Sequence, residues 1–168
     1  MNFLTHIITL IFLFICTIGF SQWSDSFSDG ELFNNPSWQG DISDFMIDDG
    51  VLKLNAQVAG STVLFTQIQP NDDLEWVWEF RIKQNFAGSG NNNSRVFLWS
   101  QTADFYNDEN PALSTAYYLQ FGESGSNDAI ELFRIDEGSV EPISICRGID
   151  GVISGSFEKK YRIWAINL

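Results

Sequence analysis

The side chains that could carry out catalysis are few and badly spaced in this sequence. Glu75 and Glu79 lie four residues apart in a predicted strand, which places them on one face at a separation of about 13 Å. The two carboxyl groups of a glycosidase lie about 5 to 9.5 Å apart, and the strand pattern Glu-x-Asp-x-x-Glu of some glycosidases does not occur here. A nucleophile elbow, a phosphate loop and a histidine-bearing zinc motif are also missing from the sequence. We therefore predict that the chain is not an enzyme.

Few histidine and cysteine residues are present to act as a base or a nucleophile. The one histidine, His6, lies in a predicted leader together with Cys16, which leaves Cys146 as the thiol of the exported chain. A cysteine nucleophile needs a base such as histidine, and the alternating run 143–146 is typical of a strand. We therefore predict that Cys146 is a small buried hydrophobe. The domain would then be stabilised by its core and not by an internal disulfide.

The N-terminal segment has the features of a signal peptide. Residues 7–20 form an almost unbroken apolar run, followed by small residues in the cleavage positions before Gln22. The run is shorter than the about 20 residues that a bilayer-spanning helix needs. The segment 1–6 contains no Lys or Arg, and an uncleaved membrane anchor is the alternative. We predict that residues 1–21 are removed and that the protein is exported, to the medium or to the outer cell surface.

The charge balance excludes two classes of partner. Nine Lys and Arg against 22 Asp and Glu give a formal net charge of −13, with 44% hydrophobic and 15% aromatic residues. Nucleic acid and anionic lipid are bound by clustered positive charge, so neither is an expected partner. The composition suits one acidic globular domain with a substantial core.

Acidic loops suggest calcium as a cofactor. Asp25 and Asp29 lie near the first predicted strand, and Asp104 and Asp108 lie in the loop 102–111. Calcium takes about six to eight oxygen ligands, and no spacing here matches an EF-hand loop. These four aspartates are therefore weak candidates for binding Ca²⁺, and solvated acidic loops are the favoured alternative.

The hydrophobic period along residues 22–168 is two, which indicates strands and not helices. Asp49 and Gly50 separate two short apolar runs and predict a type I′ hairpin turn. In the run 75–83 apolar and charged residues alternate, so Trp76, Trp78, Phe80 and Ile82 are expected to point one way. Further strands are predicted at 61–68, 95–100, 116–121, 129–135, 140–146 and 161–168.

Many short strands separated by turn-rich segments predict an all-β protein, an antiparallel β-sandwich or jelly roll. We expect residues 22–168 to form this sandwich. The run 161–168 is apolar on both faces and is predicted to be a central, buried strand. Since domains normally end in polar surface residues, we expect the domain to be truncated at its C-terminus. A true closing strand is the alternative.

Several segments resemble a known group of domains. The segments 23–30 (WSDSFSDG) and 35–41 (NPSWQGD), followed by the hairpin at 49–50, resemble the start of concanavalin A-like, laminin-G-like jelly rolls in Bacteroidota surface proteins. The segments 75–80 and 93–98 resemble the same group. The resemblance implies a jelly roll at the N-terminus of a longer secreted protein, often with lamin-tail or sorting modules downstream. It implies no catalytic residue.

The second face of the predicted strands suggests a ligand site. If the strands are neighbours, alternation places aromatic rings beside polar side chains on one face, as in carbohydrate-binding pockets. The candidate residues are Arg81, Phe97, Trp99, Tyr118, Gln120, Glu131 and Phe133. The alternative is that loops cover this face. We therefore predict a carbohydrate-binding or adhesive module, with glycans or other surface polymers as partners. A structural spacer and, less favoured, a glycoside-active jelly-roll enzyme are the alternatives.

Overall fold

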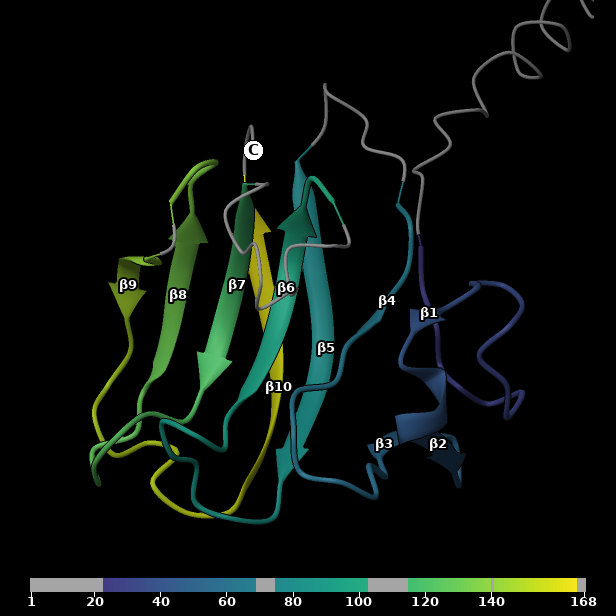
Figure 1. Ribbon diagram of the computed structural model, residues 1–168, viewed down its shortest axis with the longest axis horizontal. Helices are drawn as coiled ribbons and strands as arrows, with labels where there is room; N and C mark the ends of the chain where they lie inside the picture. Colours follow the sequence, from purple (N-terminus) through teal and green to yellow (C-terminus); the bar gives the residue numbers. More distant parts are fainter. Residues whose placement is uncertain (1–22, 69–74, 103–114, 140, 166–168) are drawn as a thin grey trace, which may run out of the picture. The chain divides into compact units, whose positions relative to one another are not determined.

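The computed structural model describes residues 23–68, 75–102, 115–139 and 141–165 of the chain (Figure 1). Their regular structure consists of antiparallel strands and one short 3-10 helix, which confirms the predicted all-β class. The predicted signal peptide, residues 1–21, lies outside the described residues. Among the described segments, no helix has the length and apolarity needed to cross a membrane. The chain divides into two compact units, Met1–Gln69 and Pro70–Leu168.

The first unit consists of short paired strands. Its elements are β1 (Gln39–Gly40), the 3-10 helix η1 (Ile42–Asp44), β2 (Phe45–Asp48), β3 (Val51–Leu54) and β4 (Leu64–Phe65). β1 pairs with β4, and β2 pairs with β3. The backbone angle φ is 53° at Asp49 and 68° at Gly50, the left-handed values that a type I′ turn requires. The predicted hairpin is therefore confirmed, whereas the strand expected over 61–68 is limited to β4.

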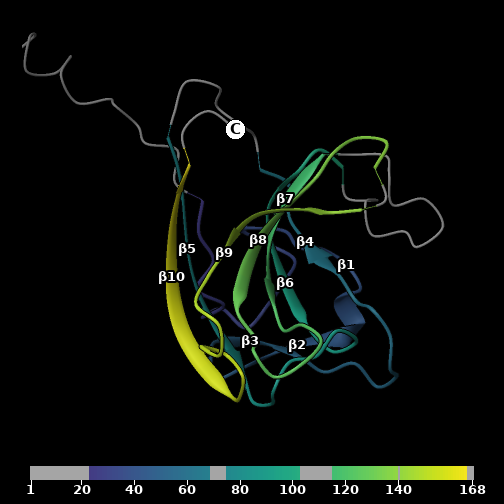
Figure 2. The same cartoon turned by 90° about the vertical axis from the view of Figure 1, so that its left-hand side faces the viewer.

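The second unit contains two antiparallel sheets. A four-stranded sheet is formed in the order β6 (Ser94–Ser100), β7 (Ala116–Phe121), β8 (Ile130–Ile135) and β9 (Ile143–Arg147). β5 (Trp76–Gln84) and β10 (Phe157–Ala165) form a two-stranded sheet, which we call the ribbon. Figure 2 shows the ribbon on one side of this unit and the four-stranded sheet on the other. A hydrogen bond of 3.1 Å from the Ser94 hydroxyl to the Gln84 side chain links the two sheets.

The core of the second unit lies between the ribbon and the four-stranded sheet. Leu119, Phe121 and Ile153 are at most 8% exposed at its centre. Around them pack Phe80, Ile82, Phe157, Tyr161 and Ile163 of the ribbon and Val96, Ile130 and Leu132 of the four-stranded sheet. Two sheets that share one apolar core form a sandwich-like arrangement. The core contacts of Phe80 and Ile82 confirm the predicted inward face of β5.

Two residues are more exposed than the sequence suggested. Trp164 in β10 is 63% exposed, so the prediction of a strand buried on both faces is wrong there. The ribbon turns one face to the core, where Ile163 packs, and the next residue along the strand therefore points away. Cys146 is exposed as well, because β9 is the last strand of its sheet. The prediction of a buried thiol is wrong for this reason.

Candidate functional site

The register of the four-stranded sheet places two rows of side chains on its outer face. Because Leu119 and Phe121 of β7 point into the core, Tyr118 and Gln120 point the other way. Residues paired with these two across neighbouring strands share that face. We call the two sets the polar row (Arg95, Gln120, Glu131 and Arg147) and the aromatic row (Phe97, Tyr118, Phe133 and Ser144).

The two rows contain most of the residues that were predicted to form the ligand site. The five residues of the prediction that lie on this face are Phe97, Tyr118, Gln120, Glu131 and Phe133. Arg95, Ser144 and Arg147 were not among the candidates. Alternation along the predicted strand 95–100 already places Arg95 on the outer face, so this pattern could have identified it as a candidate. Arg147 lies one residue beyond the predicted strand 140–146, so the sequence pattern gave no reason to include it.

Tyr118 lies at the centre of the aromatic row. Its ring stacks on Phe133, with centroids 5.3 Å apart, and contacts Phe97 at 4.9 Å. The guanidinium carbon of Arg95 lies 5.2 Å from the Tyr118 centroid, within the range of a cation–π interaction. Tyr118 is only 1% exposed, whereas Phe97 and Phe133 are half-buried. Tyr118 thus faces the predicted side but is covered there, and it supports the two flanking rings.

Hydrogen bonds run along the polar row. Arg95 Nε donates to Gln120 Oε1 at 3.0 Å, and the Gln120 amide donates to the Gly122 carbonyl at 3.1 Å. At the far end Arg147 Nη1 donates to the Glu131 carboxylate at 2.9 Å. The other oxygen of Glu131 accepts from the Ser144 hydroxyl. The row therefore presents donors and acceptors in fixed orientations, the arrangement by which a binding site orients polar ligand groups.

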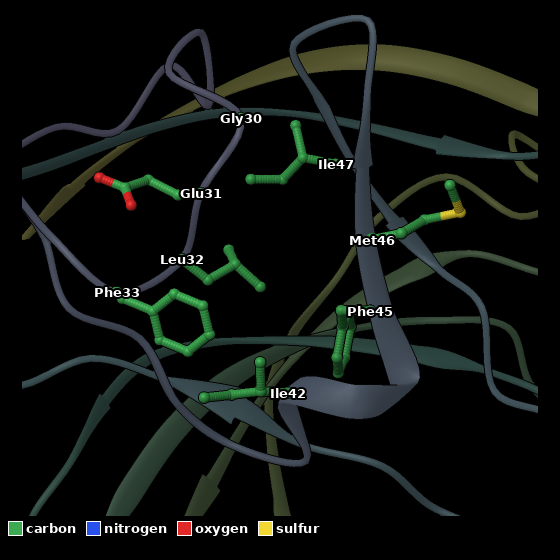
Figure 3. Close-up of a pocket in the computed structure, with 8 residues that line it drawn as sticks. All are labelled: Gly30, Glu31, Leu32, Phe33, Ile42, Phe45, Met46 and Ile47. Atoms are coloured by element: carbon green, nitrogen blue, oxygen red, sulfur yellow. The ribbon is translucent and has the colours of Figure 1, made fainter.

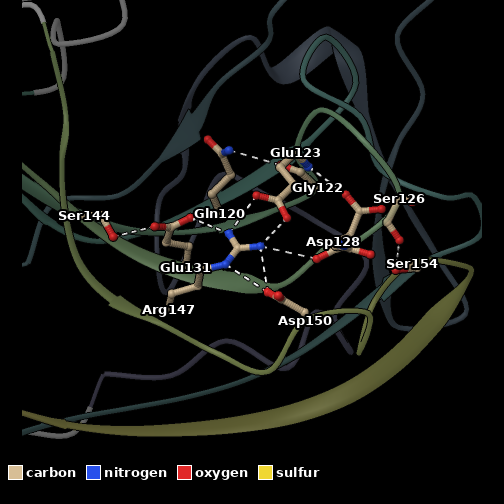
Figure 4. Close-up of polar contacts among 11 residues, drawn as sticks. Gln120, Gly122, Glu123, Ser126, Asp128, Glu131, Ser144, Arg147, Asp150 and Ser154 are labelled. Atoms are coloured by element: carbon tan, nitrogen blue, oxygen red, sulfur yellow. Dashed lines mark hydrogen bonds and ion pairs between the residues drawn. The ribbon is translucent and has the colours of Figure 1, made fainter.

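Arg147 is the centre of a charged cluster at the edge of the sheet (Figure 4). Its guanidinium forms ion pairs with Glu123, Glu131 and Asp150. The hydrogen bond from Arg147 lowers the pKa of the Glu123 carboxyl, and that of Arg147 is raised by its carboxylate partners. The Arg147 side chain is 35% exposed and that of Glu131 16%. The cluster carries more negative than positive charge and fastens the loop after β9 to the sheet.

A β-bulge separates Trp99 from the two rows. The register shifts between Phe97 and Trp99, so that Trp99 pairs with Tyr117. Their ring centroids lie 6.5 Å apart. Tyr117 precedes Tyr118 in β7 and points to the opposite face. The structure therefore does not bring Trp99 together with the two rows, because one inserted residue reverses the faces of the strand beyond it.

Arg81 is also placed apart from the rows. It lies in β5 on the outer face of the ribbon, where its guanidinium forms an ion pair with Glu158 at 3.1 Å. Its neighbours Phe80 and Ile82 face the core from the opposite sheet. Alternation correctly predicted that Arg81 points outward, but it does not determine which sheet a strand joins. Arg81 is therefore removed from this candidate site.

The predicted metal candidates that the structure describes accept local hydrogen bonds. Asp25 Oδ1 accepts from the Phe27 amide at 2.7 Å, and its Oδ2 accepts from the Trp38 indole nitrogen at 2.7 Å. Asp29 accepts from a backbone amide at 3.3 Å. In the described part of the chain, no group of three or more His, Cys, Asp or Glu side chains is arranged to hold a metal ion. The other two candidates, Asp104 and Asp108, lie outside the described residues.

A hollow of about 260 Å³ lies in the first unit (Figure 3). It is lined by Gly30, Glu31, Leu32, Phe33, Ile42, Phe45, Met46 and Ile47. The Glu31 carboxylate points away from the hollow in Figure 3 and accepts from the Asn34 amide at 3.0 Å. The other lining side chains are apolar, so the hollow offers fewer polar side chains to orient a ligand than the two rows do. The two rows of the four-stranded sheet are therefore the stronger candidate.

Comparisons with protein-family models, with curated proteins and with solved structures found no match to this chain. The resemblance to concanavalin A-like domains therefore stays a prediction. The fold itself defines an all-β protein with antiparallel sheets.

Proposed function

We propose that this chain is an exported, non-catalytic β-sandwich module of the jelly-roll, concanavalin A-like type that binds carbohydrate. The binding surface is the outer face of the four-stranded sheet. The observation that supports it is the side-by-side placement of the polar row and the aromatic row by the strand register. In this proposal residues 1–21 direct export and the module belongs to a larger secreted or surface protein, as in Bacteroidota.

The chemistry of the two rows suits a sugar. Phe133 and Phe97 are half-buried rings held in place by Tyr118, and the CH-rich face of a pyranose packs against such rings. Gln120 and Glu131 supply the amide and carboxylate groups that orient hydroxyls. Around Arg147 this face carries three carboxylates to one cation, Glu123, Glu131 and Asp150, and this local excess favours neutral over carboxylated sugars.

A structural spacer is the second candidate function, and the burial of Tyr118 favours it. A ring that is 1% exposed offers no face to a ligand. The polar row also satisfies many of its own hydrogen bonds. In this case the two rows would hold the sheet together, and the module would present neighbouring modules without a ligand of its own.

Binding of neutral oligosaccharides to the purified full chain, measured by calorimetry over a panel, distinguishes these two functions. In the variant Phe133→Leu, the ring is lost while an apolar side chain still covers Tyr118. We expect affinity to fall about two- to tenfold, the contribution of one aromatic contact. Trp99→Phe is the control, since Trp99 lies on the other face. A folded chain that binds no member of the panel would contradict the proposal and support the spacer.

A further inference from the structure

The basic residues of this acidic chain are concentrated in the ribbon. The sequence has nine Lys and Arg and a net charge of −13. Five of the nine lie in β5 and β10, namely Arg81, Lys83, Lys159, Lys160 and Arg162. The other four are spread over the remaining strands. An uneven distribution of this kind produces a local positive potential on a protein that is negative overall.

The register of the ribbon brings four of these cations to one surface. Opposite residues in β5 and β10 share a face, and the outward pairs are Lys83–Glu158, Arg81–Lys160, Glu79–Arg162 and Val77–Trp164. We call these eight residues the basic face. It contains four cations and two carboxylates, and it ends in an apolar pair. The opposite face of the ribbon is occupied by core residues such as Phe80 and Tyr161.

Each carboxylate of the basic face is shared between two cations. Glu158 forms ion pairs with Arg81 at 3.1 Å and with Lys83 at 3.2 Å. Glu79 forms ion pairs with Lys160 and Arg162. The pKa values of both carboxyls are lowered by these hydrogen bonds. One carboxylate cannot saturate two cations, so the guanidinium and ammonium groups keep donors free for a further anion.

The basic face is accessible along its length. The side chains of its four cations are 57 to 69% exposed. Trp164 is 63% exposed and Val77 43%. Its four pairs extend over six residue steps of β5, from Lys83 to Val77, which gives a surface about 20 Å long. Such a surface suits an extended, linear ligand better than a compact one.

We propose that the basic face binds a carboxylated polysaccharide, as a second surface distinct from the neutral-glycan site of the proposed function. Guanidinium groups bind carboxylates through paired, charge-assisted hydrogen bonds, and Trp164 supplies an exposed ring for the CH face of a sugar. Nucleic acid fits less well, because its dense phosphate charge is repelled by a chain of net charge −13. A polysaccharide with at most one carboxylate per sugar meets less repulsion.

Binding of the purified full chain to polygalacturonate, compared with neutral dextran, tests this proposal. Lys160→Gln removes one cation of the basic face. Lys53→Gln is the matched control, since Lys53 is also an exposed, ion-paired lysine but lies in the first unit. We expect polygalacturonate to bind at low salt, Lys160→Gln to weaken it about two- to fivefold, and Lys53→Gln to leave it unchanged. Binding should fall as salt is raised, because exposed charges are screened.

A second variant changes affinity in the opposite direction. Glu158→Gln removes a negative charge and releases Arg81 and Lys83, so polygalacturonate should bind more tightly than to the unmodified chain. Absence of binding at low salt would overturn the proposal. Equal losses in Lys160→Gln and Lys53→Gln would overturn it too, as would equal binding of poly-glutamate or of DNA. The result for Phe133→Leu with neutral glycans is separate, so the two binding proposals can fail independently.

Discussion

Truncation of Phe121 should destabilise the second unit more than truncation of any exposed aromatic residue. The Phe121 side chain is 0% exposed and lies between the two sheets. Its ring stacks on Phe157 at 5.9 Å and contacts Tyr161 at 5.5 Å. An aromatic side chain buries about 150 to 250 Å², worth about 4 to 6 kcal/mol at about 25 cal/mol per Å². Phe121→Ala retains only the Cβ, and we expect a loss of about 3–5 kcal/mol.

Urea unfolding followed by tryptophan fluorescence measures this loss. The midpoint should fall while the slope m stays constant, since the surface exposed on unfolding changes little. Trp164→Ala is the control, because Trp164 belongs to the same unit and is 63% exposed. Surface substitutions of this kind usually change stability by less than about 0.5 kcal/mol.

A refuting result would be equal loss of stability in Phe121→Ala and Trp164→Ala. The outer face of the ribbon would then be buried in the folded protein, and the placement of the core between the two sheets would be incorrect. A loss below about 1 kcal/mol in Phe121→Ala would contradict the same reasoning.

Three further predictions concern the charged cluster, the first unit and export. In Arg147→Gln the pKa of Glu123 should rise toward its ordinary value of 4.5, as measured by NMR titration, because Arg147 is the main cause of its lowering. Because the pKa of Glu123 is lower in the folded chain than in the unfolded chain, the Glu123–Arg147 pair stabilises the fold fully above a pH of about 4.5. This stabilisation is lost as the pH falls through the lowered pKa of Glu123. If stability depended on pH in the same way in Arg147→Gln, this reasoning would be contradicted. Asp25→Ala should lower the stability of the first unit by about 1–2 kcal/mol in thermal unfolding, because the Asp25 carboxylate accepts hydrogen bonds from the Phe27 amide and the Trp38 indole. Asp29→Ala should lower it less, because Asp29 accepts one hydrogen bond of 3.3 Å. Mass spectrometry of secreted protein should find an N-terminus at Gln22, and an intact Met1 would disprove cleavage.

Sequence alternation predicted which residues of a strand share a face, and this accounts for most of the candidate site. Tyr118 and Gln120 lie opposite Phe133 and Glu131 because the β7–β8 pair is regular. Period two is a property of the strand backbone itself, so it can be derived from local sequence. The hairpin at Asp49 was also predictable from local sequence, because its turn conformation is set by the two residues that form it.

The errors arose where structure depends on contacts distant in sequence. The bulge before Trp99 has no marker in the chain, yet it moves that ring to the opposite face. Arg81 pointed outward as predicted, but its strand pairs with β10, more than seventy residues later, and local patterns carry no information on that partner. The exposure of Cys146 follows from the edge position of β9, which is set by strand order and not by the alternating sequence around it.

The central claim, that the outer face of the four-stranded sheet binds neutral glycan, is tested most directly by NMR mapping. The isotopically labelled full chain would be titrated with neutral oligosaccharides while backbone amide shifts are recorded. The account predicts that the shifted amides cluster at Phe97, Gln120, Glu131 and Phe133, and that the ribbon is unaffected. Shifts confined to the hollow beside Phe33, or a folded chain that shows no shifts with any oligosaccharide, would contradict it.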